Sequence, residues 1–328
     1  MALIKVKERG RETVNLGRRN ILINGAFQNW QRGTSFNSNV YGSDRWKFYA
    51  PGSHAYSRST DTPDYGLATE PTGFEFSASL GGSGDATGLT QFVESRNSKH
   101  IPISGSTKVI LSFYLKHTTN SGTAKITSSI GTLDSADSSG ATTTRSTQNH
   151  NTTTGWVRYT HETTGATLTS AAGNGVQVTI KHNGSGTTAF LLTGCQLEIS
   201  ELVTPFEHRS VGEELSLCQR YYHQANFTAG PHYGGGAIAM YAFNANEAGG
   251  TTTFPVTMRA APAVRTKDAA GNIGGIHRAA VANVTSGVAI GWSGNADANT
   301  KGISGLNKTG AWATGNLLIG GYEADAEI

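Results

Sequence analysis

The amino-acid sequence predicts an all-β protein with two β-sandwich domains, joined by a short helix and preceded by an extended basic N-terminal arm. Three observations predict this class. The chain has 328 residues, about twice the length of a typical single domain. Glycine accounts for 42 residues, and the polar remainder is mostly Ser, Thr and Asn, which favour turns and sheet faces over helices. Charged residues make up only 15%, against roughly 25% in an average globular protein.

The first element is the arm, residues 1–20, which is polar and lacks a sustained apolar period. It carries six basic residues against Glu8 and Glu12, a net charge of +4 in a chain whose total is +3. Such an arm could bind nucleic acid by counterion release, dock on an acidic protein surface or remain a solvated leader. Because no aromatic residue is interleaved with these charges and no basic cluster follows them, docking on protein is favoured over nucleic acid. The predicted docking residues are Lys5, Lys7, Arg9, Arg11, Arg18 and Arg19.

Residues 21–209 are predicted to form the first β-sandwich. An apolar run closed by the turn signal Asn24-Gly25 opens it, and alternating apolar residues or short apolar runs follow. The Ser/Thr/Gly-rich stretch 134–155 is predicted to be a long exposed loop. Strands are predicted at residues 21–23, 108–116, 156–161, 176–181 and 189–192.

Residues 210–224 are predicted to form a connecting helix. Ser210 and Glu213 have the S-x-x-E spacing of a capping box, and Leu215, Cys218 and Tyr222 follow at helical spacing. Residues 225–328 are predicted to form the distal β-sandwich. Alternating apolar residues predict strands at residues 254–258 and 288–292, and residues 317–322 are predicted to form a terminal strand.

Two cysteines, Cys195 and Cys218, are too few for a disulfide framework, and their spacing does not fit a metal site. The N-terminus lacks the apolar segment of a signal peptide, and no apolar run is long enough to span a bilayer. We therefore expect no cofactor, no metal and no membrane insertion. We also expect synthesis in a reducing compartment without an export signal of its own.

Several blocks of the sequence are distinctive, above all NILINGAFQNWQRGTS at residues 20–35, followed by YGSDRW at 41–46. The later blocks are GCQLEI at 194–199, TPFEHRS at 204–210, EEL at 213–215, CQRYY at 218–222 and FPVTMRAAP at 254–262. In their order and spacing, these blocks resemble phage virion proteins described as tail-fibre or carbohydrate-binding-module-like proteins. The resemblance spans roughly residues 20 to 265.

The resemblance implies a jelly-roll sandwich, a short helix and a distal β domain in a trimeric appendage, without a defined catalytic site. No heptad stretch is present to enforce a trimer. The expected function is host-surface glycan attachment by a tail fibre or similar appendage of a virion assembled in the host cytoplasm. The arm would dock on other virion proteins, and host polysaccharide would be the ligand. The alternatives are a capsid-decorating, head-fibre or architectural protein without a receptor role, a polysaccharide depolymerase and a free lectin.

The candidate ligand-binding residues fall in two groups. Asp44 and Arg45 could bind sugar hydroxyls while Trp46 stacks on a pyranose, or all three could form a structural corner in an aromatic-rich region. In the distal domain, glycine-rich loops favour exposure of aromatic residues for receptor binding, although the two tryptophans could instead close the core. These distal candidates are Tyr233, Trp292 and Trp312, with His232 beside them.

No catalytic residue is assigned. Glu207-His208 could suggest acid–base chemistry, but no further ligand or base lies at a suitable spacing, so a strand-to-helix hinge is favoured. A glycosidase needs two carboxylates about 5–10 Å apart across a cleft, and spacing does not show that any pair faces one. The carboxylate pairs considered for that role are Asp134 with Asp137 and Glu198 with Glu201.

Overall fold

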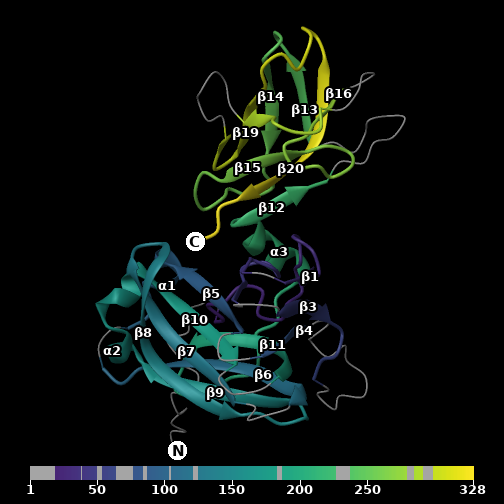
Figure 1. The fold of residues 1–328 in the computed structure, drawn as a ribbon. Helices are drawn as coiled ribbons and strands as arrows, with labels where there is room; N and C mark the ends of the chain where they lie inside the picture. The colour runs from purple at the N-terminus through teal and green to yellow at the C-terminus, as the bar shows by residue number, and fades with distance from the viewer. Residues whose placement is uncertain are drawn as a thin grey trace, which may run out of the picture. The chain divides into compact units, whose positions relative to one another are not determined.

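The computed structural model describes residues 19–37, 39–49, 54–63, 77–83, 87–102, 105–120, 125–182, 187–226, 237–278, 284–290 and 298–328. The chain divides into two compact units, one reaching to Arg209 and one comprising Ser210–Glu327. Both units are built from antiparallel sheets, so the predicted all-β class is confirmed (Figure 1). Among the described residues, no helix is long and apolar enough to cross a membrane.

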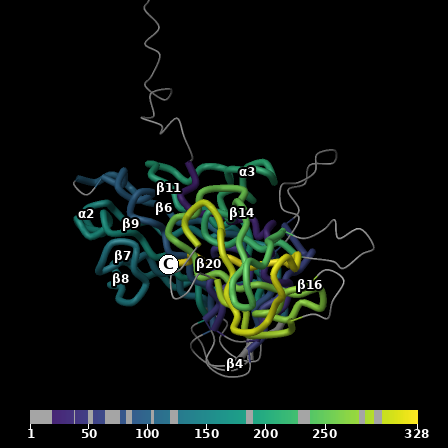
Figure 2. The backbone as a smooth tube through the Cα atoms, turned by 90° about the horizontal axis from the view of Figure 1, so that it is seen from above, coloured from purple at the N-terminus to yellow at the C-terminus, as the bar shows by residue number. Residues whose placement is uncertain are grey.

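The first unit is a sandwich of two antiparallel sheets. One sheet has six strands in the order β1-β3-β4-β11-β6-β9, and the other has five in the order β2-β5-β10-β7-β8. The long neighbouring strands β7 and β8 lie side by side in both views (Figures 1 and 2). The elements are β1 Ser35–Phe36, β2 Lys47–Tyr49, β3 Ala55–Ser59, β4 Ser77–Ser83, β5 Gly88–Glu94, α1 Ser95–Ser98, β6 Lys108–Asn120, β7 Lys125–Ser135, β8 Ser138–Asn151, β9 Val157–Thr164, α2 Gly165–Leu168, η2 Ser170–Asn174, β10 Gly175–His182 and β11 Thr187–Ile199.

The core of this unit lies between the two sheets. On β10, Val176, Val178 and Ile180 are fully buried and alternate with half-buried polar residues, as the period-2 pattern predicts. The strand predicted at residues 108–116 is β6, and its residues 109–113 are buried on both faces. Strands inside a sandwich contribute one face to a shared core, and here this core includes Leu89, Val93, Val109, Leu111, Phe113, Ile126, Ile130, Phe190, Leu192 and Leu197.

The segment predicted as a strand at residues 21–23 is instead a buried loop packed on β11. A register shift in β11 between Thr193 and Gln196 marks a bulge, and the loop pairs with the backbone around it. Ile21 N donates to Leu197 O, and Cys195 N donates to the oxygen of Gly25. A Cβ at Gly25 would lie 2.1 Å from Cys195 O, so this close approach requires glycine.

The stretch 134–155, predicted as a loop, is mostly strand. Residues Ser138–Asn151 form β8, which pairs with β7 along its length. As the edge strand of its sheet, β8 exposes most of its side chains, so it needs no alternating apolar residues. Its threonines have a high β propensity, which supports a polar edge strand. A search for alternating apolar residues therefore does not detect this strand.

The second unit is built around the long strand β20. Its first half pairs with β13 and β16, and its second half pairs with β12 and β15. The described strands form one curled nine-stranded sheet that encloses a single core. The elements are α3 Val211–Gln219, β12 Tyr222–Ala225, β13 Ile238–Ala242, β14 Glu247–Thr253, β15 Ala263–Lys267, β16 His277–Arg278, β17 Ala289–Ile290, β18 Ala298–Asn299, β19 Gly302–Asn307 and β20 Leu317–Asp325.

Two sequence expectations in this unit are corrected. The helix begins as predicted, with Ser210 Oγ accepting a hydrogen bond from Glu213 N, but it ends at Gln219, and Tyr222 begins a strand. Residues 254–258 form no strand. Pro255 has no backbone N–H to offer a ladder, and the flanking amides of Phe254 and Met258 bond only to residues 300–301.

Candidate functional site

A groove of about 240 Å³ lies on the face of the five-stranded sheet that points away from the core. All five strands contribute to it, so it crosses the sheet from β2 to β8. At roughly 4.8 Å per strand spacing, this is a path of ~19 Å. The lining residues are Tyr49, Gly88, Thr90, Ser129, Gly131, Thr142, Thr144, Gln177, Thr179 and Lys181.

The strand register sets hydroxyl groups in a row across the groove. Thr90 of β5 pairs with Thr179 of β10, which in turn pairs with Ser129 of β7. The Oγ1 atoms of Thr90 and Thr179 lie 2.9 Å apart. Because side chains alternate along each strand, these residues face the groove while neighbours such as Leu89 and Val178 face the core. The row therefore offers hydroxyl donors and acceptors at sheet spacing.

The floor of the groove is bare main chain at two places. A Cβ at Gly88 would lie 2.6 Å from Ile180 O, and one at Gly131 would lie 2.8 Å from Thr143 O. Larger residues at either position would collide with the neighbouring strand. Glycine at both sites lets a ligand approach the sheet closely.

The chemistry of the groove combines one aromatic ring, several neutral polar groups and one charge. The Tyr49 side chain is 53% exposed at one end, and Gln177 supplies an amide. Among the lining residues that the structure describes, Lys181 carries the charge, and none is acidic. A ring that presents an apolar face, beside hydroxyl and amide groups that fix orientation, suits a polyhydroxylated ligand with apolar ring faces.

The predicted ligand-binding cluster Asp44-Arg45-Trp46 lies in the core. All three residues are at most 1% exposed, so they do not present a surface on which a sugar could stack. Trp46 Nε1 donates to Asn24 O, and the Arg45 guanidinium donates to Phe92 O. The structural-corner interpretation therefore describes this cluster, and its assignment to ligand binding is corrected.

Trp312 is 5% exposed and packs in the core of the second unit, so its assignment to receptor binding is also corrected. The other two distal candidates, Tyr233 and Trp292, lie outside the described residues, as does His232. The described part of this unit does expose two large aromatic side chains, Tyr241 and Phe243, at 58% and 50%. Sequence reasoning did not single them out.

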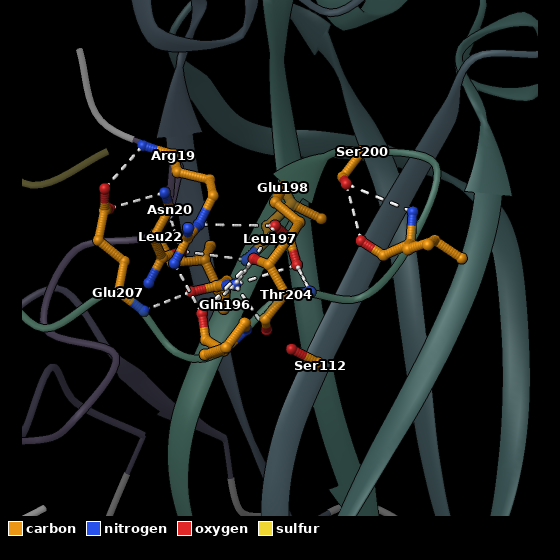
Figure 3. A network of polar contacts seen from close by, with 12 residues as sticks. Arg19, Asn20, Leu22, Ser112, Gln196, Leu197, Glu198, Ser200, Thr204 and Glu207 are labelled. Atoms are coloured by element: carbon orange, nitrogen blue, oxygen red, sulfur yellow. Dashed lines mark hydrogen bonds and ion pairs between the residues drawn. The ribbon is translucent and has the colours of Figure 1, made fainter. Parts of the chain in front are cut away.

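Arg19, predicted to dock on a partner, is held within the first unit (Figure 3). Its guanidinium donates to Pro205 O at 2.7 Å and lies 3.7 Å from a carboxylate oxygen of Glu198. Its backbone N–H donates to Glu207, as does that of Asn20. Arg19 therefore ties the first described residues to the segment that contains Glu198, Pro205 and Glu207. The other predicted docking residues, Lys5, Lys7, Arg9, Arg11 and Arg18, lie outside the described residues.

Glu207 lies in the segment between β11 and α3 and belongs to the same network. Burial acts to raise the pKa of Glu207, but the N–H groups of Asn20 and Arg19 and the charge of Arg209 outweigh it and lower the pKa. The buried carboxylate of Glu198 accepts hydrogen bonds from Gln196 and Thr204 (Figure 3). The Glu207 carboxylate thus binds the backbone of residues 19–20, and the Glu198 carboxylate binds Gln196 and Thr204.

A second polar cluster lies inside the first unit. Ser128 Oγ is 2.8 Å from His150 Nε2 and 2.9 Å from His161 Nδ1, and Ser146 Oγ is 2.8 Å from His161 Nε2. Burial, with the neighbouring His150 adding to it, lowers the pKa of His161 to about 4. Ser128 and both histidines are at most 5% exposed, so this serine–histidine arrangement lies out of reach of a substrate.

The remaining predicted carboxylates lie elsewhere. Asp137 accepts hydrogen bonds from Ser95 at the start of α1, and Asp134 accepts one from Thr143. Neither lines the groove. Within the described ranges, no group of three or more His, Cys, Asp and Glu side chains is placed to hold a metal ion.

No family model matches the sequence, and no curated protein matches it. Solved structures that are similar to parts of the chain include a phage tailspike domain, a putative sugar binding protein and TmCBM61. The tailspike protein 4 enzymatically active domain of bacteriophage CBA120 aligns at 15% identity with a TM-score of 0.37, covering 56% of this chain and 22% of that one. The chain thus spans about a fifth of that domain's length.

A putative sugar binding protein from Bacteroides thetaiotaomicron aligns at 11% identity with a TM-score of 0.38, covering 55% of this chain and all of that one. TmCBM61 in complex with beta-1,4-galactotriose aligns at 13% identity with a TM-score of 0.32, covering 56% of this chain and all of that one.

The groove itself escaped the sequence reasoning. The alternation of Gln177, Thr179 and Lys181 with buried apolar residues indicated a polar strand face. The sequence does not reveal the strand order, which places β10 between β5 and β7. A groove assembled from five strands that are distant in sequence has no local motif.

Proposed function

We propose that the first unit binds an extended glycan in the groove of its five-stranded sheet. The observation that carries the proposal is the groove itself, an open path lined by an exposed tyrosine, hydroxyl rows and a glutamine, with glycine at two points of the floor. Pyranose rings have apolar faces for an aromatic ring and equatorial hydroxyls for Thr, Ser and Gln side chains. A path that crosses five strands favours a polymer over a single sugar.

The first test removes the aromatic ring. Full-length protein and its Tyr49→Ala variant are applied to an array of bacterial capsular and O-antigen polysaccharides, with xylan and galactan included. We expect Tyr49→Ala to weaken binding by about 10-fold or more, because the ring's buried area is lost. The matched control is Tyr241→Ala, which removes an equally exposed tyrosine from the second unit and is expected to bind as the parent does. A parent that retains no glycan, or equal binding by Tyr49→Ala, refutes the proposal.

We further propose that the protein is a homo-oligomeric, probe-like appendage of a phage particle, a trimer by the sequence resemblance, which attaches to host-surface glycan. The resemblance of residues 20–35 and 41–46 to phage virion proteins supports this role, as does the basic arm that precedes them. An open groove binds a glycan chain weakly. Many copies of the protein on one particle would raise the effective concentration of binding sites.

Deleting residues 1–18 tests the arm, because it leaves Arg19 and its contacts in place. We expect the truncated chain to fold and bind glycan normally but to be missing from purified particles. Normal incorporation of the truncated chain would refute docking by the arm. In this proposal the groove binds without cleaving, so new reducing ends after incubation with a retained polysaccharide would favour the depolymerase alternative.

A further inference from the structure

Lys181 is the one charged side chain among the described residues that line the groove, and its surroundings point to the charge of the ligand. It is half-buried on β10. Within the described part of the chain, no hydrogen bond or ion pair engages its ammonium group. Burying an ammonium under a ligand without a counter-charge carries a desolvation cost, which an anionic group on the ligand offsets.

The strand register places Lys181 beside the aromatic end of the groove. Tyr49 of β2 pairs with Gly88 of β5, and Gly88 pairs with Lys181 of β10. Two strand spacings, ~10 Å, therefore separate the Tyr49 and Lys181 backbones. Gly88 has no side chain to stand between them. One ligand can contact the tyrosine ring and the ammonium group at once.

Charge beside the groove points the same way. Lys47 is outside the groove lining, but it lies on the same face of β2 as Tyr49 and pairs with Thr90, so its strand adds a second cation near this end. Its ammonium lies 5.9 Å from the centre of the Tyr41 ring. The other described lining residues are neutral, so an anionic ligand meets no opposing carboxylate along the path.

From these contacts we infer that the glycan is acidic, a polysaccharide whose carboxylate pairs with Lys181 while an adjacent ring stacks on Tyr49. This inference rests on the proposed function, since it names the class of glycan that the same groove binds. A charge-assisted hydrogen bond is roughly twice as strong as a neutral one. The Lys181 ammonium group therefore favours binding of acidic polysaccharides over neutral ones.

The test compares each acidic polymer with its own neutral form. Polygalacturonate, alginate, hyaluronan and every acidic glycan retained on the array are used before and after chemical reduction of their carboxylates to alcohols. The full-length protein is expected to bind at least one acidic form about 10-fold or more tightly than the reduced form, and added salt is expected to weaken that binding.

Lys181→Gln is expected to abolish this preference while Lys181→Arg retains it. Lys99→Gln is the matched control, because it removes the same charge from an exposed site outside the groove, and the basic arm is present in every variant. Thermal melting checks that each variant folds.

The outcomes separate the two claims. If neutral glycans bind in a Tyr49-dependent way and neither carboxylate reduction nor Lys181→Gln changes the affinity, the acidic ligand is refuted and the glycan groove stands. If Lys99→Gln and Lys181→Gln lower the affinity equally, the preference reflects net charge and the role of Lys181 is refuted. If no glycan of either kind binds, the proposed function fails as well.

Discussion

At the scale of single residues, Asn24 organises the buried corner that the sequence resemblance emphasised. It is fully buried, and its side-chain amide donates to the carbonyls of Asn29 and Asp44 while accepting from Asn29 N. Its backbone lies in the left-handed region, at φ 57°, which asparagine tolerates better than most residues. Its carbonyl accepts from Trp46. One residue thus satisfies several buried polar groups of the corner.

Asn24→Ala should therefore destabilise the first unit strongly. The change removes three buried side-chain hydrogen bonds and places alanine at a positive φ, so we expect a loss of at least ~3 kcal/mol in the free energy of unfolding. Urea denaturation measures it. The control is Asn174→Ala, which removes one side-chain bond, to Asp134 O, and is expected to cost less than ~1 kcal/mol. Equal midpoints for the two variants would contradict this account of the corner.

At the scale of elements, the sequence predicts a strand where its side chains include enough apolar residues to fill a core. The alternating pattern at residues 176–181 identified β10 because half of its side chains lie in the core, and the apolar residues of 317–322 identified β20, which is buried on both faces. The edge strand β8 and the buried loop at residues 21–23 were missed, since the first has little apolar content and the second is held by the bulge in β11. Local pattern does not encode such nonlocal pairing.

The same limit explains the misassigned site residues. Asp44, Arg45 and Trp46 have side chains suited to sugar binding, and only the burial of their backbone segment shows that they brace a core. Tyr49, four positions after Arg45, lies on the open face of the short strand β2. Composition identified the aromatic-rich neighbourhood, but the strand pairing decides which of its rings face solvent.

At the scale of the whole molecule, buried histidines make stability depend on pH. Burial lowers the pKa of His150 and His161 in the first unit and of His223 in the second. At a pH below the ordinary histidine pKa of about 6.5, these side chains are protonated in the unfolded chain but stay neutral in the folded protein. Stability contributed by the neutral rings is therefore fully present above pH ~6.5 and is lost as the pH falls toward the folded-state values.

We expect the unfolding free energy of the parent to fall between pH ~6.5 and ~4, with His161 contributing up to ~1.4 kcal/mol per pH unit. His161→Gln keeps a neutral hydrogen-bonding group near Ser128 and Ser146 and is expected to flatten this slope. His117→Gln, at a half-buried histidine on β6, serves as the control and should keep the slope. The measurement is urea denaturation across this pH range, and an unchanged slope in His161→Gln would contradict the assignment.

The glycine floor of the groove also bears on how this protein could change its target. Gly88 and Gly131 keep the main chain accessible, while the side chains around them alternate with those that fill the core. Substitutions at Gln177, Thr179 or Lys181 therefore alter what is recognised without disturbing the packing of Val176, Val178 and Ile180. If the groove binds glycan as proposed, its ligand preference can therefore change through one face of β10 while the other face keeps the core intact.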